Sequence, residues 1–369
     1  MNQGNSFGNQ VRLTLIGESH GRGVGAVMDG VPAGYPVDTR AVNDELGRRR
    51  PGQSSLTTTR KEPDTVDVLS GLFNDRTTGA PICMMVWNQD VDSSKYEKFK
   101  SIPRPGHADF PARIKYGGYN DYRGSGRFSG RITAGIVMAG AIASQIIRRT
   151  HEIRVCAHVR QVGDVRYEGD VDVRRARVQV ESNSVRCYDQ AIAVEMEHAI
   201  EFARKEDDSI GGIIECIVDN PPRGLGNPRF QGIDSNIASM MFSIGGVKGI
   251  EFGAGFKAAK MRGTMHNDPY GMDGNQNIVI RSNNAGGVLG GMTTGEQIIF
   301  RIAVKPTSSI GAPQSSVDIM TNEEVSLEYE GRHDPCIVPR AVPVVESAAW
   351  FVLLDALIES SLIPPVYRE

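Results

Sequence analysis

Three segments that lie far apart in the chain place a histidine or an aspartate beside turn-forming residues or arginines. They read Gly-Glu-Ser-His-Gly at 17–21, Arg-Pro-Gly-His-Ala-Asp at 104–109 and Gly-Arg-His-Asp-Pro at 331–335, and three consecutive arginines occupy 48–50. Guanidinium groups match the geometry of carboxylates and phosphates, and a histidine can move a proton beside them near neutral pH. The pattern indicates an enzyme that acts on a phosphorylated, carboxylated small molecule.

Each of these segments also has an ordinary structural explanation when it is taken alone. Residues 17–21 are typical of a hairpin turn with a structural histidine, and residues 104–109 of a surface loop. The arginines at 48–50 suit a solvated helix C-terminus, and at most two of three adjacent side chains could reach one ligand. A serine nucleophile is not indicated, because a histidine next to a serine in sequence does not make a triad.

Two glycine-rich regions favour anion binding. The stretch 123–131 interleaves three arginines with glycines and serines directly before an expected helix. Backbone amides, a helix N-terminus and guanidinium groups can converge there on one anion. Residues 283–291 and Lys-Pro-Thr-Ser-Ser at 305–309 suit a cofactor phosphate, although the glycines could equally form tight turns. Neither region has the spacing of a Walker loop or of Gly-x-Gly-x-x-Gly.

The composition is that of an ordinary soluble globular protein. Charged residues make up 23% of the 369 residues, and the formal net charge of −3 disfavours nucleic acid or an anionic membrane as the main partner. We expect no secretory signal, and we expect the apolar stretches 132–147 and 341–358 to be too short and too polar to span a bilayer. Five dispersed cysteines without a CxxC pair argue against disulfides or a zinc site and suit a reducing cytoplasm.

The elements that must position these residues alternate between strands and helices. Residues 160–187 are expected to form a peripheral strand region, and no clean domain boundary is visible, so we predict a single domain over 1–369. The segments 25–34 and 213–222 share a strand followed by an Asp-x-x-Pro turn, through either duplication or chance. The predicted strands are 11–16, 24–28, 66–70, 82–87, 152–159, 212–218 and 297–304, and the predicted helices are 38–48, 133–148, 189–205, 234–243 and 342–361.

Taken together and in this order, the segments resemble the chorismate synthase family over residues 5–355. Further matching pieces are Arg-Arg-Arg-Pro-Gly at 48–52, Asp-Tyr-Arg-Gly at 121–124, Ser-Ile-Gly-Gly-Val-Lys-Gly-Ile-Glu at 243–251 and Ala-Gly-Gly-Val-Leu-Gly-Gly at 285–291. The resemblance implies an anti-1,4-elimination that converts 5-enolpyruvylshikimate 3-phosphate to chorismate and phosphate. This last step of the shikimate pathway, in aromatic amino acid biosynthesis, needs reduced FMN.

The resemblance also implies roles for individual residues. His20 resembles a histidine that protonates the reduced flavin, His107 one that assists the leaving phosphate, and Asp334 an aspartate that helps to abstract the ring proton; no metal is implied. The implied substrate contacts are Arg49, Arg104, Ser129, Arg131 and Arg332. The implied flavin contacts are Arg127, Phe128, Ser129, Gly245, Gly246, Gly290, Lys305, Pro306, Thr307, Ser308, Ser309 and Arg332.

The implied fold is of the α+β class, a β-α-β sandwich with helices between antiparallel sheets and an internal pseudo-repeat. The family also implies a cytoplasmic homotetramer, with NADPH as a possible reductant of the flavin. The sequence departs from the family's pattern at Ser55, where an arginine is common, at Phe128, where a serine is common, and at Gly245-Gly246, which replaces Asn-Ala.

Two other functions are compatible with the arginine-rich segments. One is an enzyme of phosphorylated acids that uses no flavin. The other is a non-enzymatic anion or nucleic-acid binder that uses residues 48–50 and 123–131, for which binding would fall steeply with salt.

Overall fold

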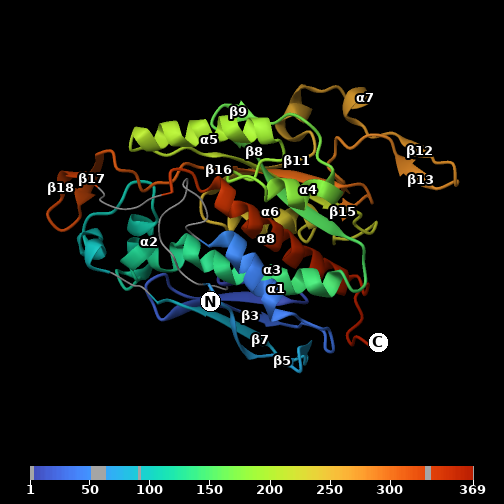
Figure 1. Ribbon diagram of the computed structural model, residues 1–369, viewed down its shortest axis with the longest axis horizontal. Helices are drawn as coiled ribbons and strands as arrows, with labels where there is room; N and C mark the ends of the chain where they lie inside the picture. Colours follow the sequence, from blue (N-terminus) through green and yellow to red (C-terminus); the bar gives the residue numbers. More distant parts are fainter. Residues whose placement is uncertain (1–3, 51–63, 90–92, 329–333, 369) are drawn as a thin grey trace.

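Two five-stranded antiparallel sheets enclose a layer of helices in the structure, a computed structural model that describes residues 4–50, 64–89, 93–328 and 334–368 (Figure 1). The strand order is β1-β2-β3-β7-β4 in the first sheet and β11-β16-β10-β8-β9 in the second. The first sheet contains β1 Ser6–Phe7, β2 Arg12–Gly17, β3 Gly23–Asp29, β4 Asp67–Ser70 and β7 Ile82–Trp87. The second contains β8 Arg154–Val162, β9 Val165–Arg166, β10 Gly212–Asp219, β11 Val247–Phe252 and β16 Ile298–Val304. This arrangement belongs to the α+β class.

The helical layer is built around α3 (Thr133–Ile147) and α8 (Val338–Glu359), which pack against each other. Helix α3 also contacts the first sheet through β3, and α8 contacts the second through β8. A Cβ atom at Gly140 would lie 2.3 Å from the Cα atom of Ser347, so glycine permits this close approach of the two helices. Their packing offsets the cost of about 1 kcal/mol that glycine carries inside a helix.

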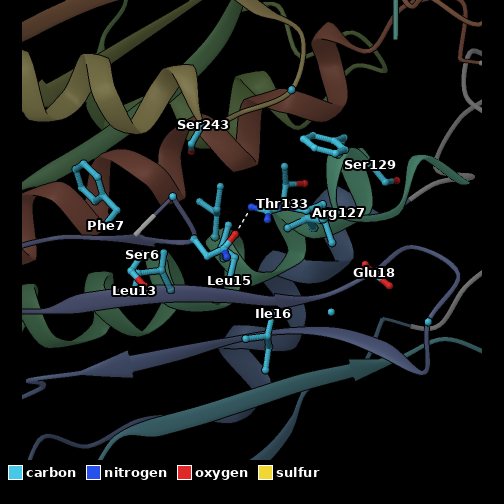
Figure 2. Close-up of a pocket in the computed structure, with 18 of the residues that line it drawn as sticks. Ser6, Phe7, Leu13, Leu15, Ile16, Glu18, Arg127, Ser129, Thr133 and Ser243 are labelled. Atoms are coloured by element: carbon cyan, nitrogen blue, oxygen red, sulfur yellow. Dashed lines mark hydrogen bonds between the residues drawn. The ribbon is translucent and has the colours of Figure 1, made fainter. Parts of the chain in front are cut away.

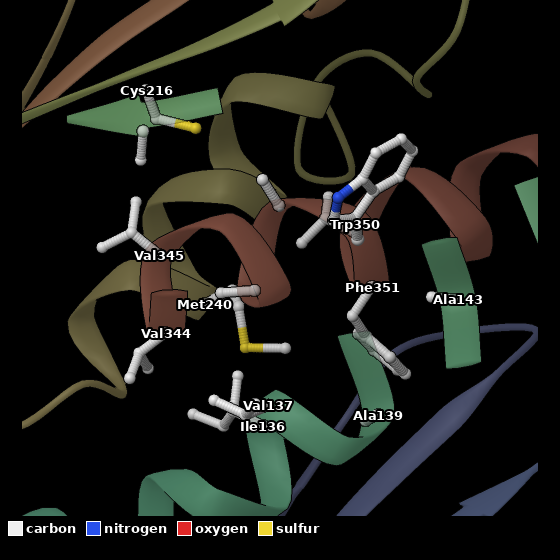
Figure 3. Close-up of a cluster of buried hydrophobic side chains, with 14 of the residues drawn as sticks. Ile136, Val137, Ala139, Ala143, Cys216, Met240, Val344, Val345, Trp350 and Phe351 are labelled. Atoms are coloured by element: carbon white, nitrogen blue, oxygen red, sulfur yellow. The ribbon is translucent and has the colours of Figure 1, made fainter. Parts of the chain in front are cut away.

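The hydrophobic core lies where this helical layer meets the sheets. Figure 3 shows Val137 of α3, Met240 of α6 (Ile233–Phe242) and Phe351 of α8 within one cluster of buried side chains. The same cluster reaches from Val11 to Ile363 along the chain. Helix α1 (Thr39–Arg49) packs against both α3 and α8, and Asp38 caps it by accepting a hydrogen bond from the Arg40 amide at 2.8 Å.

The expectation that the two long apolar stretches are too short and too polar to span a bilayer was wrong. The helical stretches 130–147 and 338–359 are both long and apolar enough by length and composition. In each, however, 89% of the apolar segment is buried inside the protein. A helix that is apolar on every side is typical of the core of a large protein as well as of a membrane span, so we interpret both as core helices.

The remaining elements surround the two sheets and the helical layer. Helix α5 lies outside the second sheet, and the β12–β13 hairpin projects from the body (Figure 1). The helices are η1 Ser94–Lys100, α2 Asp109–Tyr116, η2 Arg123–Phe128, η3 Gly130–Ile132, α4 Val173–Val180, α5 Gln190–Lys205, η4 Gly255–Lys260 and α7 Gly263–His266. The strand pairs are β5 Leu72–Phe73 with β6 Arg76–Thr77, β12 Tyr270–Met272 with β13 Ile278–Ile280, β14 Val288–Leu289 with β15 Met292–Thr293, and β17 Gln314–Asp318 with β18 Glu323–Leu327.

All the predicted strands and helices are present, with ends displaced by up to four residues. The interpretation of 160–187 as a strand region was wrong over 173–180, where α4 lies, although the end of β8 and the whole of β9 fall within the range. Both segments that share the Asp-x-x-Pro turn fold as a strand, a turn and a helix, since β3 leads to α1 and β10 leads to α6. Their origin by duplication stays a prediction.

Candidate active site

His20 lies in the turn between β2 and β3, and that turn is held by Asn88, which directly follows β7. The side-chain Nδ2 atom of Asn88 donates to the carbonyl oxygens of Glu18, Ser19 and Gly21 at 3.2, 3.0 and 2.9 Å. The His20 Nδ1 atom lies 3.0 Å from the Ser93 hydroxyl oxygen. Asn88 was not among the predicted site residues, although a polar residue at the end of a buried strand was a usable signal.

The glycine-rich stretch 123–131 packs directly on this turn. Gly124 and Ser125 adopt left-handed backbone conformations, with φ of 55° and 68°, and the Gly126 carbonyl accepts a hydrogen bond from the Ser19 amide at 3.2 Å. A Cβ atom at Gly124 would lie 2.2 Å from the His20 ring, so only glycine fits there. Two segments predicted to bind ligands are therefore in contact.

Arg49 and Arg131, both predicted substrate contacts, share one buried carboxylate. Asp64 accepts from Arg49 at 3.1 Å and from Arg131 at 2.5 Å, and its side chain has no exposed surface. Arg49 also donates to the Gly130 carbonyl at 2.8 Å. The Arg131 Nε atom donates to the Asn88 side-chain oxygen at 3.0 Å, which connects this pair to the His20 turn. Arg48 and Arg49 are buried, so residues 48 and 49 are not a solvated helix end.

Arg104, another predicted substrate contact, forms hydrogen bonds with Asp109 of its own loop and with Ser125 of the glycine-rich stretch. Its guanidinium group donates to both carboxylate oxygens of Asp109, at 2.7 and 2.8 Å, and to the Ser125 hydroxyl at 3.0 Å. The same guanidinium carbon lies 4.7 Å from the centre of the Phe99 ring. Arg104 thus connects the 104–109 loop to the glycine-rich stretch.

His107 lies between its own loop and the 305–309 segment. Its Nδ1 atom is 3.0 Å from the Pro105 carbonyl oxygen, and its Nε2 atom is 2.9 Å from the Ser309 hydroxyl oxygen. Lys305 donates to the Gly106 carbonyl at 2.7 Å. Burial, together with the positive charge of Arg104, lowers the pKa of His107 to about 4, so the imidazole is neutral at pH 7 without a ligand.

Asp334 is buried and forms an ion pair with Arg340. The Arg340 Nε atom lies 3.5 Å from the Arg49 carbonyl oxygen, so Asp334 is joined through one side chain to the end of α1. Pro335 accepts a hydrogen bond from the Ile210 amide, while the Ser209 hydroxyl donates to the Thr307 carbonyl. Ser209 and Ile210 thus connect the residue that follows Asp334 to the 305–309 segment. Arg332 and Ser55 lie outside the described residues.

A cavity of about 1060 Å³ opens beside these segments. Figure 2 shows its apolar wall, to which Leu13 and Leu15 of β2 contribute, and its polar part, which contains Glu18, Arg127 and Ser129. Apolar side chains from α3 and α6, among them Ile136 and Met240, line it as well. Burial and the carboxylate of Asp121 raise the pKa of Glu18.

The cavity accounts for part of the predicted flavin set. Arg127, Phe128, Ser129 and Gly245 all line it, and the Ser129 hydroxyl accepts from the Arg131 amide at 3.2 Å. The Gly246 carbonyl accepts from the Lys305 amide at 2.9 Å, which joins the 305–309 segment to this region.

Gly245 follows the C-terminal end of α6. Gly290 lies at the N-terminal end of this helix, because the carbonyl of its neighbour Gly291 accepts a hydrogen bond from the amide of Ile233, the first residue of α6. Ten helical residues separate the two ends by about 15 Å. Gly290 is not among the residues that line the cavity, whereas Gly245 is. Among the described residues, no group of His, Cys, Asp and Glu side chains could hold a metal ion.

The arrangement brings guanidinium groups, a neutral histidine and an apolar cavity within one connected region. It can bind a polyanion and exchange protons with it beside a flat apolar ligand.

Comparisons with known proteins agree with this chemistry. A family model described as chorismate synthase matches residues 11–358. A chorismate synthase of Korarchaeum cryptofilum is 51% identical, with 97% of this chain and 98% of the relative covered, and one of Dehalococcoides mccartyi is 46% identical, with 99% and 100% covered. A solved structure described as chorismate synthase superposes with a TM-score of 0.75 at 28% identity, covering 96% of this chain and 93% of that one.

Proposed function

The chain belongs to the chorismate synthase family, lyases of the final shikimate pathway step, and on that premise we propose how its residues carry out the reaction. The substrate is 5-enolpyruvylshikimate 3-phosphate, and the products are chorismate and phosphate. A carbon–oxygen bond to phosphate breaks and a ring proton is lost in an anti-1,4-elimination. Reduced FMN is required although the substrate and the product differ by no net redox change.

The observation that carries this proposal is the contact set around Asn88. This residue holds the His20 turn through three carbonyl oxygens and accepts a hydrogen bond from Arg131, which shares Asp64 with Arg49. Asn88 thus links the turn that carries His20 to the guanidinium groups of Arg49 and Arg131, which supports proton transfer by His20 and anion binding by the two arginines in an enzyme of a phosphorylated diacid.

The residues that line the cavity fit a flavin. Leu15, Ile16 and Ile132, which are partly exposed, offer apolar surface for a flat ring system, and Arg127 and Ser129 offer donors for its anionic part. His20 lies between Glu18 and Gly21, two residues that line the same cavity. When bound, the reduced flavin would supply transient electron density and a proton-accepting nitrogen. Phe128 lines the cavity with 42% of its surface exposed, so its ring has room to adjust to a ligand.

The protein's own groups would handle the charges and protons of the elimination. Arg49 and Arg131 would bind anionic groups of the substrate in exchange for part of their contact with Asp64. His107, neutral without a ligand, would gain a proton as the phosphate approaches, because a nearby negative charge favours the imidazolium form. Asp334, oriented by Arg340, would keep a carboxylate near the site of proton abstraction.

Several finer features belong to the same proposal. One continuous core cluster supports a single domain over the whole chain, and the family supports a pseudo-repeat and a cytoplasmic homotetramer. The two strand–turn–helix segments support the repeat, with β3–α1 in one half and β10–α6 in the other. NADPH would serve as a source of electrons for the flavin, and nucleic acid and membrane are not expected partners.

Titration of the protein with reduced FMN under anaerobic conditions tests the cofactor assignment. We expect the absorbance of bound reduced FMN to change when the phosphorylated substrate is added. An enzyme of phosphorylated acids that needs no flavin would turn over the substrate without that change. A nucleic-acid binder would instead bind oligonucleotides with a steep salt dependence and leave the substrate intact.

A further inference from the structure

Arg186 is a buried arginine that lies outside every predicted site segment. It sits between α4 and α5 with 6% of its surface exposed, and its φ of 58° is in the left-handed region. Its backbone carbonyl accepts a hydrogen bond from the Val159 amide of β8 at 2.9 Å, and its guanidinium group pairs with Glu181 at 3.2 Å. A buried charge and a left-handed backbone are both unfavourable, so other contacts must compensate for them.

The guanidinium group of Arg186 donates to two backbone carbonyls for which their own helices supply no amide. Its Nη2 atom lies 2.8 Å from the Arg48 carbonyl oxygen, in the last turn of α1, where carbonyls have no helical N–H ahead of them. Its Nη1 atom lies 2.8 Å from the Pro339 carbonyl oxygen, in the first turn of α8. The helical donor to Pro339 would be the amide of residue 343, which is Pro343 and has no N–H. One side chain therefore completes both helix ends.

The two helix ends that Arg186 joins are next to residues of the candidate site. Arg49 is the last residue of α1, and its guanidinium group pairs with the buried Asp64. Asp334 precedes α8 and pairs with Arg340 of that helix, whose Nε atom lies 3.5 Å from the Arg49 carbonyl oxygen. The alignment of the end of α1 with the start of α8 therefore affects where the Arg49 guanidinium group lies.

From these contacts we propose that Arg186 is a positioning residue for Arg49. By binding the Arg48 and Pro339 carbonyls at once, it fixes the end of α1 against the start of α8 and so holds the Arg49 guanidinium group beside Asp64. Arg186 acts through Arg49 and does not touch the substrate. The consequence for substrate binding rests on the proposed function, in which Arg49 binds an anionic group of the substrate.

A second tie between α1 and α8 separates positioning from general stability. The Arg48 guanidinium group donates to Glu346, in the middle of α8, at 2.5 Å, and the two helices also pack against each other. Removal of the Arg186 side chain leaves these contacts in place. We therefore expect the helices to stay packed while the alignment of their ends changes.

Nitrogen NMR of arginine-labelled protein, free of flavin and substrate, tests the positioning directly. The Nε–H resonance of Arg49, which donates to the Thr133 hydroxyl at 3.1 Å, is assigned by its loss in Arg49→Lys. We expect it to move in Arg186→Gly, a change that removes the guanidinium group and suits the left-handed backbone. We expect no movement in Arg177→Met, which removes an arginine of the same charge cluster that pairs with Glu45 at 2.7 Å. An Arg49 resonance that is equal in Arg186→Gly and the wild type would overturn the proposal, whether or not chorismate is formed.

Turnover at saturating reduced FMN tests the consequence for the substrate. We expect Arg186→Gly to raise the KM for the phosphorylated substrate by about tenfold, the effect of weakening one hydrogen bond to a charged group, and to change kcat less. Arg186→Lys offers one nitrogen for two carbonyls, so its KM should lie between those of Arg186→Gly and the wild type. A lower kcat with an unchanged KM, or an equal rise of KM in Arg177→Met, would contradict the proposal. Thermal unfolding identifies a variant that fails to fold, and Arg186→Lys then replaces Arg186→Gly in both measurements.

Discussion

Replacement of Asp64 by asparagine perturbs the two predicted substrate arginines together. The Asp64 carboxylate is fully buried and forms ion pairs with both Arg49 and Arg131, whose side chains are only 5% and 10% exposed. Removal of one partner from a buried ion pair costs about 3 to 5 kcal/mol, because the remaining charge stays buried and loses the compensation that this partner gave. Each kcal/mol lowers the melting temperature of a large domain by about 2 °C, so Asp64→Asn should lose about 6 °C or more.

The same change should increase the response to small anions. An anion that binds between the two guanidinium groups restores the missing negative charge, and stabilisation by a ligand rises with its concentration relative to its dissociation constant. Thermal unfolding with increasing inorganic phosphate should therefore raise the melting temperature of Asp64→Asn more than that of the wild type. The control is Asp219→Asn, whose carboxylate is 3.3 Å from the partly exposed Arg154. Partly exposed pairs of this kind contribute about 0 to 1 kcal/mol.

Two results would refute this reasoning. If the melting temperatures of Asp64→Asn and Asp219→Asn are equal, the buried carboxylate of Asp64 does not stabilise the two arginines. If phosphate stabilises Asp64→Asn and the wild type equally, the two guanidinium groups do not form an anion site.

Three further changes test other parts of the site. Gly124→Ala places a methyl group 2.2 Å from the His20 ring at a φ of 55°, so turnover should fall sharply and stability by about 1 to 2 kcal/mol. The control is Gly263→Ala, where no atom of the described residues lies within 4 Å of an added Cβ atom, and equal turnover in the two variants would contradict the contact. Arg49→Lys should weaken substrate binding, measured by titration, because a lysine cannot replace the separate contacts to Thr133, Asp64 and Gly130. Arg40→Lys, at an exposed position, is the control and should bind substrate normally. Unchanged substrate affinity in both variants would exclude Arg49 as a substrate contact. Because the folded-state pKa of His107 is about 4 and its unfolded value about 6.5, stability should be fully present above pH 6.5 and decline as the pH falls towards 4. In His107→Gln, urea unfolding should show a smaller decline over that range, and identical pH dependence in both proteins would contradict the shift.

The sequence predicted the elements whose signals are local. The cap at Asp38 and the small residues of α3 both led to helices found within a residue or two of their expected ends. Helix α4 was missed because its charged residues suggested a surface strand. Its buried residues Val173, Ala176 and Val180, at helical spacing after the cap Asp172, were the signal that the prediction overlooked.

The candidate site was predictable in its residue types but not in their partners. The arginine-rich segments pointed to anion binding, yet the sequence could not show that Asp64 lies between Arg49 and Arg131. Arg48 illustrates the reason, because its partner Glu346, at 2.5 Å, lies 298 positions further along the chain. Contacts between distant segments depend on the tertiary fold, and no local pattern encodes them.

The central claim is that these segments together form one flavin-dependent phosphate-eliminating site. Its most direct test is an anaerobic reaction of the protein with photoreduced FMN and 5-enolpyruvylshikimate 3-phosphate, followed by the absorbance of chorismate. We predict equal amounts of chorismate and phosphate, flavin that is still reduced at the end, and no product with oxidised FMN. Product formed equally well without reduced flavin, or no product with it, would contradict the account.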